Sequence, residues 1–221
     1  MTPKILLLAS CVTAMDLKDY PEFQDLVDGG APPGLDGSSA SQEHRAFLLN
    51  SCSMCEAVSF HAAFAFMKHK QERSRGLRGD YSVTDVVDNL CSERNVVWKQ
   101  QYGVTRGTIG LLVGPGISTT RRQQAVRDPS MMEGVAMRLS SACSDMLGGG
   151  EQDEQHWFDV TEQALRRNKH EPTPPGEVIV ALTKSLCDSR SAPCGRYTAQ
   201  YPGHQTTRDP RDLQVDLKDE L

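Results

Sequence analysis

Residues 52–58 of this chain are Cys52-Ser53-Met54-Cys55-Glu56-Ala57-Val58. Around them, apolar residues recur at helical spacing in two stripes, so we expect a helix that is apolar over most of its circumference and lies at the centre of the fold. The stripes are Cys52, Cys55, Val58, Ala62, Ala65 and Phe66, and Ala57, Phe60, Phe64 and Met67. Two cysteines three residues apart on a helix project from the same face. Both can therefore reach a segment that packs alongside this helix.

The cysteine count suits a disulfide framework. The chain has 7 cysteines in 221 residues, and Cys11 lies in a segment that we expect to be removed. The others form an even set, for which disulfides are the default in an oxidising compartment: Cys52, Cys55, Cys91, Cys143, Cys187 and Cys194. A nested arrangement would join the first helix to the last and tie the middle pair together. Six cysteines nevertheless allow fifteen pairings, and the sequence alone does not choose among them.

The two ends of the chain carry targeting patterns. Lys4 precedes an apolar run from Ile5 to Ala14 with small residues at its end, so we expect residues 1–14 to be a signal peptide. The run is too short to span a bilayer, and we expect no membrane insertion elsewhere. The last four residues are the ER-retrieval tetrapeptide, which a KDEL receptor reads: Lys218, Asp219, Glu220 and Leu221. Together the patterns predict a protein of the ER lumen.

The composition predicts one folded domain between two polar segments. Residues 15–46 are acidic and then rich in Gly, Pro and Ser, so we expect a disordered arm. Residues 195–221 are polar without a hydrophobic period, and we expect a flexible tail. Residues 47–194 show helical rather than alternating apolar periods, which predicts an all-α bundle. Its expected helices after the first are residues 83–102, 128–147, 157–165 and 179–187.

Residues 105–127 fit none of these helices. They contain a brief apolar run, the turn signal Gly114-Pro115-Gly116, and then Arg121, Arg122 and Arg127. We interpret this segment as an insertion between two helices. Its arginines could meet an acidic partner, but a solvated loop is the more common explanation for such a charge run.

No pattern in the chain points to a catalytic centre, a metal or a cofactor. A net charge of -5 argues against nucleic-acid binding. The chain has no Gly-x-Ser-x-Gly, phosphate-loop or paired-carboxylate pattern. The histidines lack ligand spacing with the cysteines, so we expect isolated core or surface residues: His61, His69 and His156. Four acidic residues suit the start of a helix better than a Ca²⁺ site: Glu151, Asp153, Glu154 and Asp159. We expect the neighbouring aromatic residues Trp157 and Phe158 to anchor the core.

The cysteine spacing is accompanied by a set of local motifs. These are Cys52 to Val58, Thr84-Asp85-Val86-Val87-Asp88, Gln101-Tyr102-Gly103-Val104, Leu112-Val113-Gly114-Pro115-Gly116-Ile117-Ser118, Arg138-Leu139-Ser140 and Ala192-Pro193-Cys194. With them the chain resembles the canopy family of saposin-like ER proteins and, more closely, the related family of marginal-zone B- and B1-cell-specific (plasma-cell-enriched) ER proteins. The likeness covers about residues 51–194, and its most specific part is Gly-Pro-Gly, which helix packing does not demand. It implies the disulfides Cys52–Cys194, Cys55–Cys187 and Cys91–Cys143. A longer segment between Leu147 and Cys187 and the polar tail depart from the family pattern.

The resemblance implies a non-enzymatic chaperone cofactor in the ER lumen. Such a protein would work beside ER Hsp70- and Hsp90-type chaperones on disulfide-bonded secretory clients, immunoglobulin-like ones in vertebrates, with a link to ER calcium homeostasis. Two alternatives remain open. One is a thiol oxidoreductase that uses Cys52 and Cys55, although a thioredoxin-type site needs a preceding strand and a βαβ pattern that the sequence lacks. The other is saposin-type lipid binding, which the retrieval signal and acidic balance disfavour.

Overall fold

The computed structural model describes residues 39–76, 81–105, 110–117, 125–126, 128–166 and 173–201. These residues are mostly helical, which confirms the helical part of the predicted fold class. The elements are α1 (Ser39–Ser74), α2 (Val83–Cys91), α3 (Val96–Gln101), β1 (Gly103–Thr105), β2 (Leu112–Val113), β3 (Ala125–Val126), α4 (Pro129–Leu147), α5 (Glu151–Arg166), α6 (Pro175–Cys187) and α7 (Pro193–Gln200).

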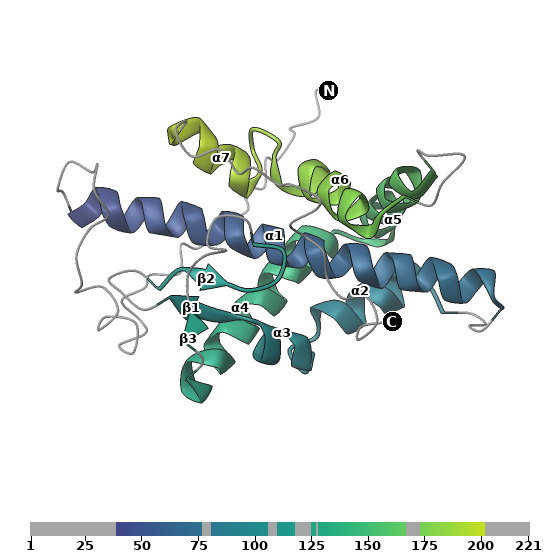
Figure 1. Ribbon diagram of the computed structural model, residues 1–221, viewed down its shortest axis with the longest axis horizontal. Coiled ribbons are helices and arrows are strands. Elements are labelled where there is room, and N and C mark those ends of the chain that lie inside the picture. The colour runs from purple at the N-terminus through teal and green to yellow at the C-terminus, as the bar shows by residue number, and fades with distance from the viewer. Residues whose placement is uncertain are drawn as a thin grey trace, which may run out of the picture.

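Helix α1 is the spine of the molecule, as its sequence predicts. With 36 residues it is about 54 Å long at 1.5 Å per residue. Helices α6 and α7 pack along one side of it, while α2, α3, α4 and the strands lie on the other (Figure 1). Side chains on all faces of its middle are at most 1% exposed, among them Ala57, Val58, Phe60, Ala62 and Phe66. Burial on both sides explains why its apolar residues show no single stripe.

The expected helix over residues 83–102 is two helices with a break between them. Helix α2 starts at a capping box, in which Ser82 and Asp85 exchange side-chain to backbone hydrogen bonds. It stops at Cys91, and Asn95 caps α3 by accepting a hydrogen bond from the Val97 amide. The carbonyl of Leu90, at the end of α2, accepts bonds from Asn95 Nδ2 and Trp98 Nε1. These side-chain donors make the break stable although the apolar period continues through it.

The described part of the chain also contains a small antiparallel sheet in the order β2-β1-β3, which the all-α expectation did not include. The sheet falls in the segment that we interpreted as an insertion. Asn50 of α1 holds it in place, because its Nδ2 donates to the Gly110 carbonyl and its Oδ1 accepts from the Leu112 amide. Arg121, Arg122 and Arg127 lie outside the described residues.

The Gly-Pro-Gly turn follows β2 and lies against α1. Tyr102 donates a hydrogen bond from its hydroxyl to the Pro115 carbonyl, at 3.0 Å. Gly116 has φ +76°, and a Cβ placed there would come within 2.5 Å of Phe60 Cβ. Only glycine satisfies both the backbone conformation and this approach. The most specific motif of the sequence is therefore explained by close packing of a turn onto the spine.

Helices extend beyond both limits that we expected for the folded domain. Helix α1 begins at Ser39, within the segment expected to be a disordered arm to residue 46. Helix α7 covers Pro193–Gln200, so the chain stays ordered past Cys194, where we expected the tail to begin. The expected helix over 128–147 is present as α4, and that over 157–165 begins earlier, at Glu151. The expected signal peptide and retrieval residues Lys218–Leu221 lie outside the described residues.

Candidate functional site

The six cysteines form three disulfides, in the pairs that the family resemblance implies. Cys52–Cys194 and Cys55–Cys187 have Cα–Cα distances of 4.4 and 5.9 Å and join α1 to α7 and α6. Cys91–Cys143 has a Cα–Cα distance of 5.1 Å and joins α2 to α4. The two cysteines of the Cys-x-x-Cys stretch are thus bonded to different helices and not to each other.

These disulfides are shielded from solvent. The two cysteines of α1 and their partners Cys187 and Cys194 are 0% exposed. In the third bridge, Cys143 is 0% exposed and Cys91 is 7% exposed. Beside Cys55–Cys187, Ser59 donates a hydrogen bond to Thr183 Oγ1 across the α1–α6 contact. Attack on a disulfide requires a thiolate to reach one of its sulfur atoms. The native arrangement gives an incoming thiol no open path to the bridges on α1.

One buried carboxylate lies next to a bridge. The side chain of Glu56 is 0% exposed, and its carboxylate and the sulfur atoms of Cys52 and Cys194 lie within 4.8 Å of one another. This is the one group of three or more potential metal ligands among the described residues. Its two sulfur atoms are bonded to each other, so they are not the thiolates that a metal requires. As folded, the cluster does not fit a metal centre.

His61 is a core residue, as expected for a histidine without ligand spacing. Its ring meets the rings of Phe60, Trp98 and Tyr102 edge to face, at centroid distances of 5.1 to 5.6 Å. Burial lowers its pKa from 6.5 to about 4, since this apolar pocket cannot solvate the imidazolium. Nε2 of His61 has no hydrogen-bond partner among the described residues. The ring is therefore neutral near pH 7 and serves packing.

The other singled-out residues also take structural positions. His69 is buried and packs on Tyr81 and Phe158. The acidic group begins α5, where Glu154 is buried and accepts a hydrogen bond from Thr84 at 2.6 Å. Phe158 belongs to the core, and Trp157 packs partly buried against it. None of these side chains forms a catalytic cluster within the described residues.

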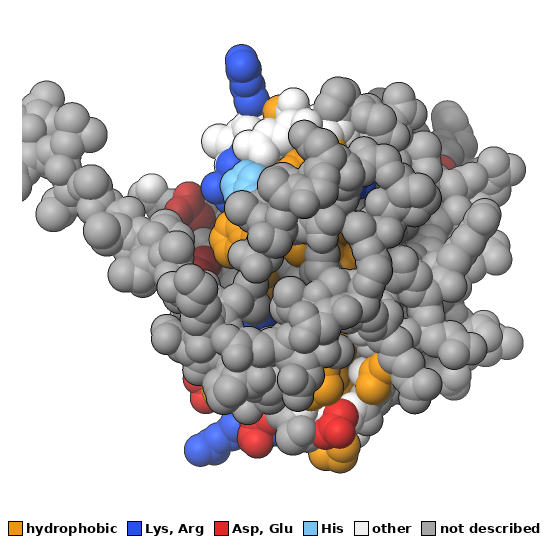
Figure 2. All heavy atoms as spheres, turned by 90° about the vertical axis from the view of Figure 1, so that its left-hand side faces the viewer, with side chains coloured by type: hydrophobic (Ala, Val, Ile, Leu, Met, Phe, Trp, Pro, Cys, Tyr) orange, Lys and Arg blue, Asp and Glu red, His pale blue; other side chains and the backbone are white. Residues whose placement is uncertain are grey.

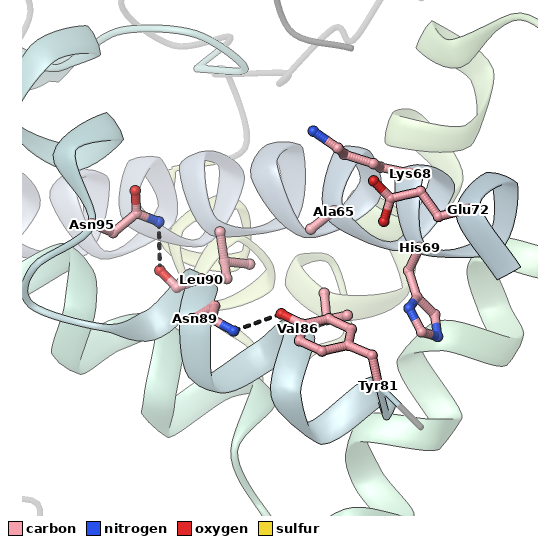
Figure 3. Close-up of a pocket in the computed structure, with 9 residues that line it drawn as sticks. All are labelled: Ala65, Lys68, His69, Glu72, Tyr81, Val86, Asn89, Leu90 and Asn95. Atoms are coloured by element: carbon pink, nitrogen blue, oxygen red, sulfur yellow. Dashed lines mark hydrogen bonds between the residues drawn. The ribbon is translucent and has the colours of Figure 1, made fainter. Parts of the chain in front are cut away.

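An open groove lies where α1 passes α2 (Figure 3). Its volume is about 240 Å³, and nine residues line it: Ala65, Lys68, His69, Glu72, Tyr81, Val86, Asn89, Leu90 and Asn95. The floor is apolar, formed by Ala65, Val86 and Leu90, and the polar side chains surround it. The sequence reasoning did not single out this groove, because its lining comes from separate segments that become neighbours only when the helices pack.

Hydrogen bonds fix part of the polar rim. Asn89 Nδ2 donates to Tyr81 Oη at 2.5 Å and to the Asp85 carbonyl at 2.7 Å. Asn95 Nδ2 donates to the Leu90 carbonyl at 2.9 Å (Figure 3). Both amide groups are thereby held in one orientation. On α1, Lys68 makes no salt bridge with any described residue, whereas Lys70 bonds to Glu162 at 3.2 Å.

The end of the molecule at the start of α1 presents a mixed surface. Figure 2 shows hydrophobic, charged and histidine side chains there, around residues that are not described. Arg45 stacks over the Tyr201 ring at 5.1 Å, and His44 hydrogen-bonds to Gln200. These contacts join α1 to α7 and leave Phe47 48% exposed.

Comparison with known proteins assigns the chain to no family. No family model, no curated protein and no solved structure matches it. None of the described helices combines the length and apolar character needed to cross a membrane.

Proposed function

We propose that this protein is a chaperone cofactor of the ER lumen, with a saposin-like, canopy-related scaffold, that assists the oxidative folding and assembly of disulfide-bonded secretory clients. Its partners would be ER Hsp70- and Hsp90-type chaperones, secretory clients and a KDEL receptor, and a link to ER calcium homeostasis belongs to the same proposal. The observation that carries it is the set of three buried disulfides. They suit an oxidising compartment and a rigid scaffold that presents surfaces to other proteins.

Burial of the bridges favours binding over redox catalysis. A thiol oxidoreductase needs an accessible cysteine with a depressed pKa. Here Cys52 and Cys55 lie in the middle of α1, bonded to α7 and α6 and 0% exposed. The N-terminus of α1, where the helix dipole would lower a thiol pKa, is at Ser39, more than three turns before Cys52.

Saposin-type lipid binding is the third candidate. It requires the helices to open and expose an apolar lining. The two bridges from α1 to α6 and α7 oppose such opening on that side of the spine. The third bridge joins α2 to α4, and no disulfide among the described residues links these two helices to α1. The case against a lipid carrier therefore rests on the acidic balance and the expected retrieval signal.

Mass mapping without reduction, on protein isolated from the ER with free thiols blocked at lysis, distinguishes the first two candidates. The chaperone cofactor predicts complete Cys52–Cys194 and Cys55–Cys187 bridges. Mixed disulfides between Cys52 or Cys55 and clients would replace it with an oxidoreductase. In parallel, depletion of the protein should slow the conversion of a disulfide-bonded client to its oxidised form, and re-expression should restore it. An unchanged client rate would reject the proposal.

A further inference from the structure

We propose that an exposed face formed by α3 and α4 joins two copies of this chain in a two-fold symmetric dimer. The face is made of four side chains: Val96 and Lys99 of α3, and Glu133 and Met137 of α4. Such a dimer goes beyond the proposed function and does not depend on it. Its mass is measured without chaperones or clients, so a monomeric protein would reject the dimer and not the proposed function.

The face contains two large apolar side chains that are exposed to solvent. Among the described residues, three large hydrophobic side chains are exposed: Phe47 by 48%, Val96 by 59% and Met137 by 47%. Phe47 lies near the start of α1, whereas Val96 and Met137 lie on two helices that pack together on the side of α1 opposite α6 and α7 (Figure 1). Single exposed apolar side chains are common on protein surfaces, but neighbouring ones form a patch.

Two contacts fix the register of α3 against α4. Just before α3, the Cys91 carbonyl accepts a hydrogen bond from Ser140 Oγ of α4. Near the other end of α3, Lys99 Nζ lies 3.4 Å from Glu133 Oε1. The two segments therefore run antiparallel. Each exposed apolar side chain is one turn from the charged residue of its own helix, because residues three or four apart share a helix face. The apolar pair thus lies across the α3–α4 seam, next to the ion pair.

This arrangement is complementary to itself. A two-fold axis along the seam places a second copy face to face with the first and exchanges the α3 side with the α4 side. Val96 then meets Met137 of the second copy, and Lys99 meets Glu133 of the second copy. Each apolar side chain gains an apolar neighbour and each charge gains an opposite one. A partner with a single sign of charge would instead bring a like charge to one member of the ion pair. The charge pattern therefore favours a second copy as the occupant.

The charges and the size of the face suit a weak dimer. In one copy the side chains of Lys99 and Glu133 are 46% and 70% exposed, so their ion pair contributes little alone. Two such pairs placed face to face with opposite polarity give each charge two opposite neighbours. Each copy contributes only two apolar side chains, so the contact belongs to the small, transient class of interfaces. We expect association at protein concentrations between about 10 and 500 µM.

Sedimentation equilibrium of the full chain over this concentration range tests the dimer. We expect the average mass to rise from that of one copy towards that of two. Val96→Glu and Met137→Glu should each weaken association at least about ten-fold, since each places a charge against an apolar neighbour. Phe47→Glu, at a similarly exposed apolar position on α1, should leave association within about two-fold. Thermal unfolding shows whether each variant is folded. A wild type that stays monomeric, or an equal effect of Phe47→Glu, would overturn the proposal.

Two charge reversals test the position of the axis. Lys99→Glu or Glu133→Lys alone brings four like charges together, so each variant should stay monomeric. Mixed in equal amounts, the two variants should form a dimer, because the added carboxylate meets the added lysine and the native Glu133 of one chain meets the native Lys99 of the other. Each reversal shifts the net charge of -5 by two, so both chains stay negative and attraction between whole molecules does not explain a mixed dimer.

The mixing experiment also separates a dimer face from a face that binds another protein. Absence of the mixed dimer would reject the two-fold axis along the seam and with it the proposal. Slower client folding with Val96→Glu, together with a wild type that stays monomeric at all concentrations, would assign the face to clients and reject the dimer.

Discussion

The two halves of α1 are held in different ways. The first half, residues 46–60, is the stapled half: Cys52 and Cys55 bond it to α7 and α6, and Ser59 hydrogen-bonds to Thr183. The second half, residues 65–74, is the open half: it carries no disulfide and borders the groove. The same helix is therefore covalently fixed where its neighbours cover it and held by weaker contacts where it faces a groove. One helix thus has a rigid part, which the disulfides fix, and an accessible part, which borders the groove.

Removal of the two staples on α1 should have the largest effect. The bridges Cys52–Cys194 and Cys55–Cys187 are nested and span 142 and 132 residues, so either one alone keeps the long loop closed. We expect the variant with all four of these cysteines replaced by alanine to lose at least about 5 kcal/mol in free energy of unfolding, the chain-entropy value for a loop of this length, measured by urea denaturation without reductant. The bridge Cys91–Cys143 spans 52 residues, so its double alanine variant should lose about 4 kcal/mol. A loss below about 1 kcal/mol for the first variant would show that the stapled half does not depend on its staple.

Glycine substitutions test how closely the turn fits the stapled half. Gly116→Ala must keep φ at +76° and brings a methyl group within 2.5 Å of Phe60 Cβ. Strain and overpacking together should lower the free energy of unfolding by about 3 kcal/mol. Gly134→Ala is the control, because the site is helical and no atom beyond its chain neighbours and its own helix backbone lies within 4 Å of the new methyl group. That variant should gain up to about 1 kcal/mol, and urea denaturation measures both variants. Equal effects at the two sites would contradict the close fit.

Local patterns predicted the central helix well and the break between α2 and α3 poorly. The central helix and its two cysteines follow from periodicity, and the pairs came from a family resemblance, since spacing alone left fifteen pairings open. The break after Cys91 was missed because apolar residues continue at helical spacing through Val97 and Trp98. Its cause is a set of side-chain bonds to the Leu90 carbonyl. Such bonds depend on three-dimensional position, which periodicity does not report.

The sheet and α7 escaped prediction for related reasons. The strands have two or three residues each, too short for an alternating pattern to be visible. Helix α7 is short and largely polar, and Cys194 anchors it to α1. The groove joins residues from α1 with residues of α2 and the segments around it, which no single window contains. Tertiary contacts decide each of these features.

The pH dependence of stability tests the junction between the halves, where His61 lies. Its pKa of about 4 in the folded protein is below the ordinary value of 6.5, so the unfolded chain takes up the proton first as the pH falls. The stabilisation of the folded protein by neutral His61 is complete above pH 6.5. It is lost as the pH falls from 6.5 to about 4, which lowers the free energy of unfolding by up to about 3 kcal/mol. His61→Leu should remove this part of the pH dependence in urea denaturation series. If wild type and variant lose stability in parallel over that range, another group is responsible.

The smallest expected effect concerns the contact that ties the open half to α5. Lys70 and Glu162 form a salt bridge with side chains 32% and 24% exposed, and Arg166 shares the same carboxylate at 2.6 Å. Solvent screening and the second cation leave about 0.5 kcal/mol for the Lys70 contact. Lys70→Met should therefore change the free energy of unfolding by no more than that, while hydrogen exchange in residues 65–74 becomes faster than in residues 46–60. Local loosening without global destabilisation is expected because no disulfide transmits the change to the stapled half. A global loss comparable to that of a staple variant would mean that the two halves act as one cooperative unit.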